Sequence, residues 1–307
     1  MKTGKILILG VTASGKGKLA FELARRLNGE IVSIDSMKVY RRMDIGTAKP
    51  APDRRQQVQY HMIDIVEPSE AFSVGLFVDK ALPILDQIQQ RGRPVVAVGG
   101  TALYIKALLY GLFDGPGADP SVRAELWQMA QIEGLQGLYR ELSGVDPEAA
   151  GRIHINDAKR IIRALEVFRI TGKPISRLQT QFNPDKSLDD WTIIGIRRDK
   201  IDENRRMNLR VKRMIDTGLV EEVKALLAEA KPLSRQARSA IGYAEIIDHL
   251  AGRTCLEDAV EQIKKDTRRL AKDQRTWFKA FRGVQWLDIQ PEEPPEQTVE
   301  RAMALWR

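Results

Sequence analysis

Residues 6–17 read Ile6-Leu7-Ile8-Leu9-Gly10-Val11-Thr12-Ala13-Ser14-Gly15-Lys16-Gly17. The apolar run predicts a buried strand, the spacing Gly-x-x-x-x-Gly-Lys follows at once, and a helical pattern runs from Lys18 to Leu27. In such a loop, backbone N–H groups converge and the helix N-terminus adds positive potential. The loop from Gly10 to Gly17 is therefore predicted to bind phosphate groups, with Lys16 as a point charge.

Position 17 departs from the form of this loop that hydrolyses nucleotides. That form has Ser or Thr after the lysine, and the hydroxyl binds Mg²⁺. This chain has Gly17. The sequence therefore favours binding of phosphate or diphosphate over hydrolysis of ATP. The competing interpretation is a glycine-rich turn that binds no ligand.

Short apolar runs alternate with helical patterns in the first third of the chain. The runs lie at residues 6–9, 31–34, 62–66 and 95–98. Strands separated by helices, with the glycine-rich loop after the first, predict an α/β fold with a P-loop NTPase-like, doubly wound parallel sheet. Ligands of such sheets bind at the carboxyl ends of the strands.

The pattern changes at about Gly115. A linker at residues 115–120 leads into helical patterns, and a short apolar run resumes at residues 191–196. We expect an α/β core built from residues 1–115 and 190–307, with C-terminal helices, and a small helical domain inserted at residues 116–189.

The composition is basic and poor in cysteine. The 307 residues contain 49 Lys and Arg against 41 Asp and Glu, and the net charge of +8 favours a polyanionic partner over a basic surface without one. One cysteine, Cys255, and three histidines leave no set for a disulfide or a structural zinc site. No apolar run is long enough for a signal peptide or a membrane span. We expect a reduced, cytoplasmic protein that binds no membrane.

Two helical patterns carry basic residues on one side. Lys159 and Arg163 lie opposite Ile161, Leu165 and Phe168 on a helical wheel. Residues 257–281 have an expected apolar stripe of Val260, Ile263, Leu270, Trp277 and Phe281 beside a basic arc of Lys264, Arg268, Lys272, Arg275 and Lys279. Each face is either a contact surface for nucleic-acid phosphates or a solvated charged surface.

Asp35 and Thr101 follow predicted strands near the phosphate loop. Asp35 is expected to order Mg²⁺ through water or to accept a proton from a nucleophile, or else to cap the turn at Ser36. Thr101 is expected to contact an anionic leaving group, to cap the helical segment at residues 103–109, or both. These parts predict group transfer from a phosphate-bearing donor by a kinase or an alkyl transferase, and Gly17 favours the second.

Several blocks along nearly the whole chain resemble the tRNA dimethylallyltransferases, also called tRNA isopentenyltransferases. They are Ser33-Ile-Asp-Ser36, Met43-Asp-Ile-Gly-Thr-Ala-Lys-Pro50, Val98-Gly-Gly-Thr-Ala-Leu-Tyr104, Arg152-Ile-His-Ile-Asn-Asp157, Arg163-Ala-Leu-Glu-Val167, Ala240-Ile-Gly-Tyr243 and the stretch from Thr267 to Trp277. Eukaryotic relatives often carry a C-terminal zinc finger, so we expect the short bacterial form.

The resemblance implies transfer of a dimethylallyl group from dimethylallyl diphosphate to N6 of the adenosine immediately 3′ of the anticodon, position 37, in tRNA. The product would be N6-dimethylallyladenosine, with diphosphate as the leaving group. By the same resemblance Gly10 to Gly17 hold the diphosphate, Asp35 accepts the N6 proton, and Thr101 lies near the reacting bond. Mg²⁺ is the implied cofactor, the tRNA anticodon stem-loop is the implied partner, and we expect a monomer.

The residues that the resemblance assigns to tRNA binding are Asp35, Ser36, Met37, Lys38, Thr101, Arg123, Lys159, Arg160, Ile161, Ile162, Arg163, Ala240, Ile241, Gly242 and Tyr243. The inserted domain is thus expected to contact tRNA. The chain departs from the family at Gly17, where Ser or Thr is usual, at Val11, where Pro is usual, and at Gln59-Tyr60-His61. Ser14 and Ser36 are the candidates to replace the missing hydroxyl.

Two other functions stay open on the sequence alone. A nucleoside or small-molecule kinase on the same core would turn over ATP in the presence of an acceptor. A tRNA-binding protein that lost catalysis when residue 17 became glycine would bind the anticodon arm and form no product.

Overall fold

The chain forms two compact units. The computed structural model describes residues 4–112, 115–179, 188 and 190–306. One unit contains residues 1–106 and 187–307, and the other contains residues 107–186. The sequence predicted these two boundaries at 115–116 and 189–190. Both predicted boundaries lie further along the chain than those of the structure.

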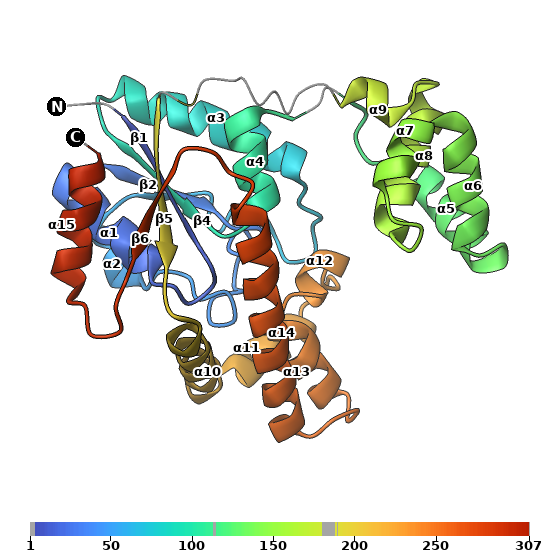
Figure 1. Ribbon diagram of the computed structural model, residues 1–307. Coiled ribbons are helices and arrows are strands. Elements are labelled where there is room, and N and C mark those ends of the chain that lie inside the picture. Colours follow the sequence, from blue (N-terminus) through green and yellow to red (C-terminus); the bar gives the residue numbers. More distant parts are fainter. Residues whose placement is uncertain (1–3, 113–114, 180–187, 189, 307) are drawn as a thin grey trace. The chain divides into compact units, whose positions relative to one another are not determined.

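The first unit is built around a parallel six-stranded sheet (Figure 1). In chain order the strands are β1 (Lys5–Gly10), β2 (Glu30–Ile34), β3 (Tyr60–His61), β4 (Val95–Gly99), β5 (Trp191–Arg197) and β6 (Val284–Asp288). Their order across the sheet is β3-β2-β4-β1-β5-β6, and every pair is parallel. Residues Ile6 to Leu9 of the central strand are fully buried, as a strand covered on both faces requires.

Helices cover both faces of this sheet, as the sequence predicted. The helices outside the second unit are α1 (Lys16–Leu27), α2 (Pro52–Gln57), α3 (Val74–Gln90), α4 (Ala102–Tyr110), which spans the division between the units, α10 (Lys200–Asp216), α11 (Leu219–Leu227), α12 (Arg235–Arg238), α13 (Tyr243–Leu250), α14 (Leu256–Phe278) and α15 (Pro295–Leu305). Helices α1 and α15 pack on one face and on each other, and α3 and α14 lie on the opposite side (Figure 1).

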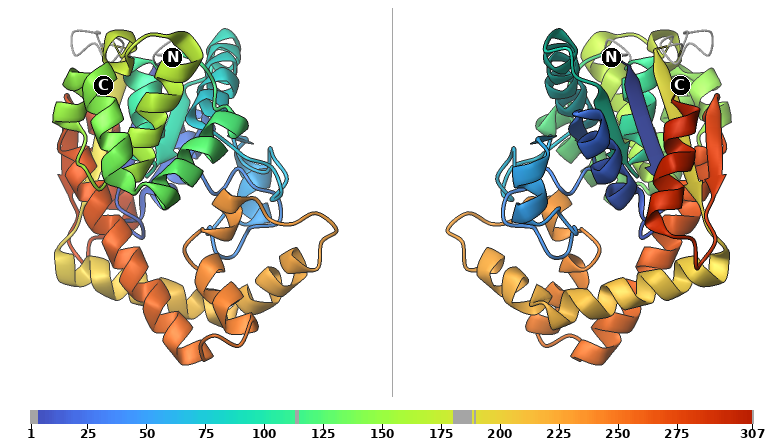
Figure 2. Two further views of the ribbon diagram at one scale, coloured as in Figure 1. Left: turned by 90° about the vertical axis from the view of Figure 1, so that its right-hand side faces the viewer. Right: turned by 90° about the vertical axis from the view of Figure 1, so that its left-hand side faces the viewer.

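Helices α10, α11, α13 and α14 form a further layer at the carboxyl end of the sheet. Helix α10 crosses α14 there, in both views of Figure 2. The first residue of α10 follows the end of β5 by a short turn, so the helix starts next to the loop after β1. None of the described helices combines the length and the apolar character that a membrane crossing requires.

Two strand predictions differ from the structure. The run at residues 62–66 was expected to form a strand, but β3 occupies Tyr60–His61, and Met62 and Asp64 have φ of 61° and 54°. Asp64 is held in this conformation by ion pairs with Lys49 and Arg55. The edge strand β6 was not predicted, because a short segment that is half-exposed carries a weak hydrophobic pattern.

The second unit is a cluster of helices: α5 (Pro120–Ile132), α6 (Leu135–Val145), α7 (Pro147–Arg152), α8 (Ala158–Thr171) and α9 (Ile175–Leu178). Asp119, Asp146 and Asp157 cap the N-termini of α5, α7 and α8 by accepting backbone hydrogen bonds. Its core contains Leu126, Leu138, Leu142, Ile161 and Leu165, all essentially inaccessible to solvent. The unit thus has a hydrophobic core of its own.

The strand ends of the sheet leave no room for a side chain at position 99. In Gly99→Ala the new Cβ would lie 2.0 Å from the Ile34 carbonyl oxygen, so the backbone of β2 or β4 must move. We expect a loss of about 2 kcal/mol or more in the free energy of unfolding, measured by urea denaturation. The control is Gly17→Ala, whose Cβ meets nothing within 4 Å. Equal stability of the two variants would contradict this account.

Candidate functional site

Three strands end side by side where the sequence predicted a ligand. Leu9 of β1 pairs with Gly99 of β4, and Gly99 pairs with Ile34 of β2. The phosphate loop, the Gly99–Thr101 segment and the turn at Asp35 therefore begin at the same edge of the sheet. This is the position at which doubly wound sheets bind their ligands.

The loop after β1 has the conformation of an anion-binding site. Ala13 and Gly15 have φ of 62° and 100°, and the Ser14 N–H donates to the Val11 carbonyl at 3.2 Å. Helix α1 begins at Lys16 and has no acidic residue in its first turn. The N–H groups at this end are therefore available to an anion, and the helix adds positive potential. Lys16 Nζ donates to the Val11 carbonyl at 3.1 Å.

Three arginines, one from the turn after β5 and two from α10, surround the loop, and the sequence reasoning missed them. Arg198 Nε donates to the Ser14 carbonyl and Arg206 Nε to the Ala13 carbonyl, both at 2.9 Å. Arg210 Nη1 donates to Thr12 Oγ1 at 2.9 Å. A signal was present, because Arg206 and Arg210 are one helical turn apart in a helix that directly follows a strand.

Gln274 of α14 joins two of the loops. Its Oε1 accepts from the Thr12 N–H at 2.8 Å, and its Nε2 donates to the Gly100 carbonyl at 2.9 Å. A Cβ at position 100 would lie 2.5 Å from Nε2, so glycine is required for this approach. One buried amide thus fixes the phosphate loop to the segment that carries Thr101.

Positive charge is concentrated at the loop. The pKa of Lys16 is lowered to about 7, mainly by burial and then by the charges of Lys38 and Arg210, while Asp35 opposes the shift. Burial also lowers the pKa values of Lys38 and Arg210, and Asp35 again opposes it. A ligand with several negative charges would relieve this repulsion.

Asp35 and Thr101 are brought together by the turn after β2. Asp35 Oδ1 accepts from the N–H groups of Met37 and Lys38 at 2.9 and 3.2 Å, so the turn-capping role left open by the sequence is present. The Ser36 N–H donates to Thr101 Oγ1 at 3.1 Å. Among the described residues, Asp35 Oδ2 accepts no hydrogen bond, and this oxygen is the one available to accept a proton.

Glu222 of α11 accepts hydrogen bonds from the backbone of the block at residues 43–50. Its carboxylate accepts from the N–H groups of Asp44 and Ile45 at 2.9 and 2.8 Å and from the Tyr243 hydroxyl at 2.6 Å. Gly46 is tightly packed, since a Cβ there would lie 2.4 Å from the Tyr243 ring. The side chains of Tyr243 and Ala240 are buried. The Tyr243 side chain supports this loop, and the predicted contact of Ala240 and Tyr243 with tRNA stays a prediction.

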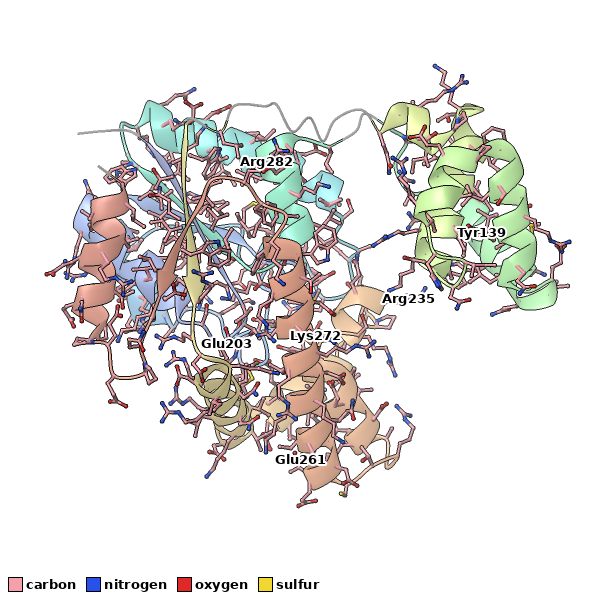
Figure 3. The ribbon with its side chains drawn as sticks, viewed as in Figure 1. Tyr139, Glu203, Arg235, Glu261, Lys272 and Arg282 are labelled. Carbon is pink, nitrogen blue, oxygen red and sulfur yellow. The ribbon has the colours of Figure 1, made fainter. Side chains whose placement is uncertain are left out.

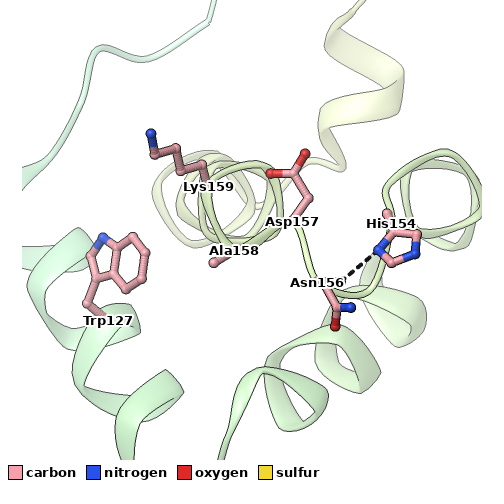
Figure 4. A pocket seen from close by; sticks show the side chains of 6 residues that line it. All are labelled: Trp127, His154, Asn156, Asp157, Ala158 and Lys159. Atoms are coloured by element: carbon pink, nitrogen blue, oxygen red, sulfur yellow. Dashed lines mark hydrogen bonds between the residues drawn. The ribbon is translucent and has the colours of Figure 1, made fainter. Parts of the chain in front are cut away.

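The predicted RNA-binding residues of the second unit divide into exposed and buried sets. Lys159 and Arg160 at the start of α8 are exposed, whereas the side chains of Ile161 and Ile162 belong to the hydrophobic core. Lys159 also borders an open hollow of about 470 Å³ with Trp127, His154, Asn156, Asp157 and Ala158 (Figure 4).

Arg123 and Arg163 have a structural partner. The carboxylate of Glu166 is fully buried, lies 2.9 Å from Arg123 and 2.6 Å from Arg163, and accepts from the Asp119 N–H. Burial would raise the pKa of Glu166, but the hydrogen bonds from Arg163, Asp119 and Arg123 hold that pKa below its usual range. These two arginines therefore neutralise a buried charge.

The apolar stripe predicted for α14 is displaced. Its buried residues are Ala259, Ile263, Thr267, Ala271, Gln274 and Phe278, while Leu270 and Trp277 are 39% exposed. Arg268 donates to Asn208, and Arg275 pairs with Glu203 of α10, so these two members of the basic arc bind protein groups. Figure 3 shows Glu203 on α10 and the exposed Lys272 on α14.

Known proteins match this chain over almost its full length. A sequence model described as IPP transferase matches residues 38–281. The chain belongs to this family. It is 48% identical to tRNA dimethylallyltransferase 2 of Geotalea uraniireducens, over 92% of this chain and 91% of that protein.

Solved structures agree with the family assignment. The full-length tRNA isopentenylpyrophosphate transferase of Bacillus halodurans is 38% identical, with a TM-score of 0.70 over 99% of this chain and 97% of that one. A eukaryotic dimethylallyltransferase acting on tRNA is 27% identical, with a TM-score of 0.80 over 98% of this chain and 78% of that one. The predicted family and P-loop NTPase-like fold class are confirmed.

The Mg²⁺ implied by the resemblance has no matching set of ligands in the described residues. Gly17 offers no hydroxyl, and no group of three His, Cys, Asp or Glu side chains in this part of the chain could hold a metal ion. The Ser14 hydroxyl is buried and has no hydrogen-bond partner in the described residues, and a Cβ on Gly10 would lie 2.8 Å from it. Ser36 Oγ lies 3.4 Å from Thr101 Oγ1. The residues present do not fit a divalent cation.

Anion binding at the loop should depend on the protonation of Lys16. Because its pKa is about 7, the cation is lost as the pH rises through neutrality. Sulfate keeps its charge over this range, and we expect its affinity to fall by up to about tenfold between about pH 6 and about pH 8. Calorimetric titration measures this. Lys16→Arg, which stays charged, should give a flat profile, and a flat wild-type profile would contradict the assignment.

Proposed function

We propose that this enzyme transfers a dimethylallyl group from dimethylallyl diphosphate to N6 of the adenosine immediately 3′ of the anticodon in tRNA. The proposal rests on one observation above all. A phosphate-binding loop, a carboxylate with one available oxygen and a threonine hydroxyl stand on three adjacent strand ends. The tRNA dimethylallyltransferases to which the chain is similar carry the same activity in their names.

The chemistry is a displacement at carbon. The N6 lone pair attacks C1 of the dimethylallyl group, and the bond between C1 and the bridging oxygen breaks. That oxygen leaves with its electron pair as part of the diphosphate. The attacking nitrogen then carries an extra proton, which passes to Asp35 Oδ2. The products are N6-dimethylallyladenosine and diphosphate.

The diphosphate would lie on the loop. The N–H groups at the start of α1 and the ammonium of Lys16 offer donors and charge, and Arg210 lies beside Thr12 in the same loop. Negative charge on the bridging oxygen increases as the bond to carbon breaks. Fixed positive groups therefore stabilise the transition state more than the substrate.

The adenosine must leave its stack in the anticodon loop to reach Asp35. In the α/β unit we assign Ser36, Met37, Lys38, Thr101, Ile241 and Gly242 to the surroundings of this base. In the helical unit we assign Lys159 and Arg160 to the phosphates of the anticodon stem-loop. A tRNA substrate would place the reaction in the cytoplasm.

Incubation of the protein with unmodified tRNA and dimethylallyl diphosphate, followed by digestion and mass spectrometry, tests the proposal. We expect N6-dimethylallyladenosine at the position after the anticodon. Binding of tRNA without product would favour the binding-only alternative. ATP turnover that depends on an acceptor would favour a kinase, which the absent hydroxyl at Gly17 disfavours.

Asp35→Asn should abolish transfer and leave the fold intact. Asparagine retains an Oδ1 that can accept from the N–H groups of Met37 and Lys38, but it cannot take a proton. We expect a loss of at least about a hundredfold in the rate of product formation, with tRNA affinity within about threefold of wild type. Single-turnover assays and filter binding measure the two quantities. Wild-type rates in this variant would remove Asp35 from the mechanism.

Lys159→Ala combined with Arg160→Ala should reduce the salt dependence of tRNA binding. Each lost phosphate contact lowers the slope of log affinity against log salt by about one. The matched control is Arg140→Ala with Lys173→Ala, which removes the same charge from other exposed positions of this unit. An unchanged slope in the first variant would show that the start of α8 does not contact tRNA.

A further inference from the structure

There is space for a side chain at position 17, where the nucleotide-hydrolysing form of the loop has Ser or Thr. Gly17 is exposed in the first turn of α1, a Cβ there would meet nothing within 4 Å, and its φ lies outside the range that favours glycine. Packing and backbone geometry therefore do not require glycine. A serine or threonine would fit, so the consequence of Gly17 is chemical: the loop offers no side-chain oxygen at this point.

Among the described residues, the neighbouring side-chain oxygen atoms other than Asp35 Oδ2 are already engaged or enclosed. Thr12 Oγ1 accepts from Arg210, and Asp35 Oδ1 accepts from two backbone N–H groups. The Ser14 hydroxyl has less than 1 Å² of accessible surface. A Cβ on Gly10 would lie 2.8 Å from it, so this hydroxyl faces the ends of the strands. A cation here would have Asp35 Oδ2 as its carboxylate ligand, and the proposed reaction needs that oxygen to accept the N6 proton.

Cationic side chains occupy the surroundings instead. The Lys16 side chain passes within 3.6 Å of the Cβ position of Gly100. Guanidinium nitrogens of Arg206 and Arg198 lie 3.6 and 3.8 Å from the Cβ position of Gly15. Arg210 Nη1 lies 2.9 Å from Thr12 Oγ1 in the loop, and the backbone N–H of Lys38 donates to Asp35 Oδ1 at 3.2 Å. A divalent cation entering this region would be repelled, whereas a diphosphate would be attracted.

We infer that this enzyme neutralises the diphosphate with Lys16, Lys38 and Arg210, supported by Arg198 and Arg206, and that the diphosphate binds without a divalent cation. The inference rests on the proposed function, because it concerns the donor of that reaction. In the nucleotide-hydrolysing form of the loop, a hydroxyl holds Mg²⁺ and the ion supplies positive charge. Here five side chains would supply that charge instead. Gly17 is then the residue that makes diphosphate binding independent of Mg²⁺.

Calorimetric titration of the full chain with inorganic diphosphate tests this, in EDTA and in excess Mg²⁺. For the wild type we expect a Kd in EDTA that is equal to or lower than the Kd in Mg²⁺. Gly17→Thr should bind at least about tenfold more tightly in Mg²⁺ than in EDTA, because it restores a metal ligand. Gly17→Ala fills the same space without a hydroxyl, so its binding should, like that of the wild type, be no tighter in Mg²⁺ than in EDTA.

A third variant tests whether a cationic side chain of the site binds the diphosphate. Arg210→Gln should weaken binding in EDTA by at least about tenfold. Wild-type binding that is tenfold tighter in Mg²⁺ would overturn the inference, and so would undiminished binding by Arg210→Gln. The transfer assay with tRNA is independent of these results. Metal-free binding without product would refute the proposed function alone, and product with metal-dependent binding would refute this inference alone.

Discussion

The parallel pairing of β1 with β4 and of β4 with β2 is the constraint on which the site depends. It brings the ends of three strands into one row, with Gly99 at its centre and no space for a Cβ. The phosphate loop, Asp35 and Thr101 are close to one another only because of this register. A shift of one residue in either pair would turn the side chains of a strand to the opposite face.

Helices of the layer at the carboxyl end of the sheet supply side chains that hold the loops of the site. Helix α10 supplies Arg206 and Arg210, and α14 supplies Gln274, which satisfies buried backbone groups of two loops at once. The pair between Glu203 and Arg275 holds these two helices together. The phosphate loop is therefore fixed from both sides before any ligand binds, and ordering it costs little when the substrate arrives.

Local patterns were enough to predict the loop, four of the six strands and the helical insertion, whereas contacts between distant segments were not. Residues 62–66 are apolar enough for a strand, but ion pairs of Asp64 with Lys49 and Arg55 hold the chain in a left-handed turn. On α14 the buried stripe is centred on Thr267, Ala271 and Gln274, which a hydrophobic pattern cannot select. The roles of Arg198, Arg206 and Arg210 required knowing that β5 lies beside β1.

The cluster of positive charge has a cost that the reaction itself offsets. Burial lowers the pKa of Lys16, and the positive charges of Lys38 and Arg210 lower it further because they repel the ammonium. Dimethylallyl diphosphate relieves this repulsion when it binds. Free diphosphate carries one more negative charge, which forms as the bond to carbon breaks. Because Lys16 and Arg210 are held by hydrogen bonds to the loop, they need not move to meet that charge, and the same fixed groups that bind the donor favour the departure of its leaving group.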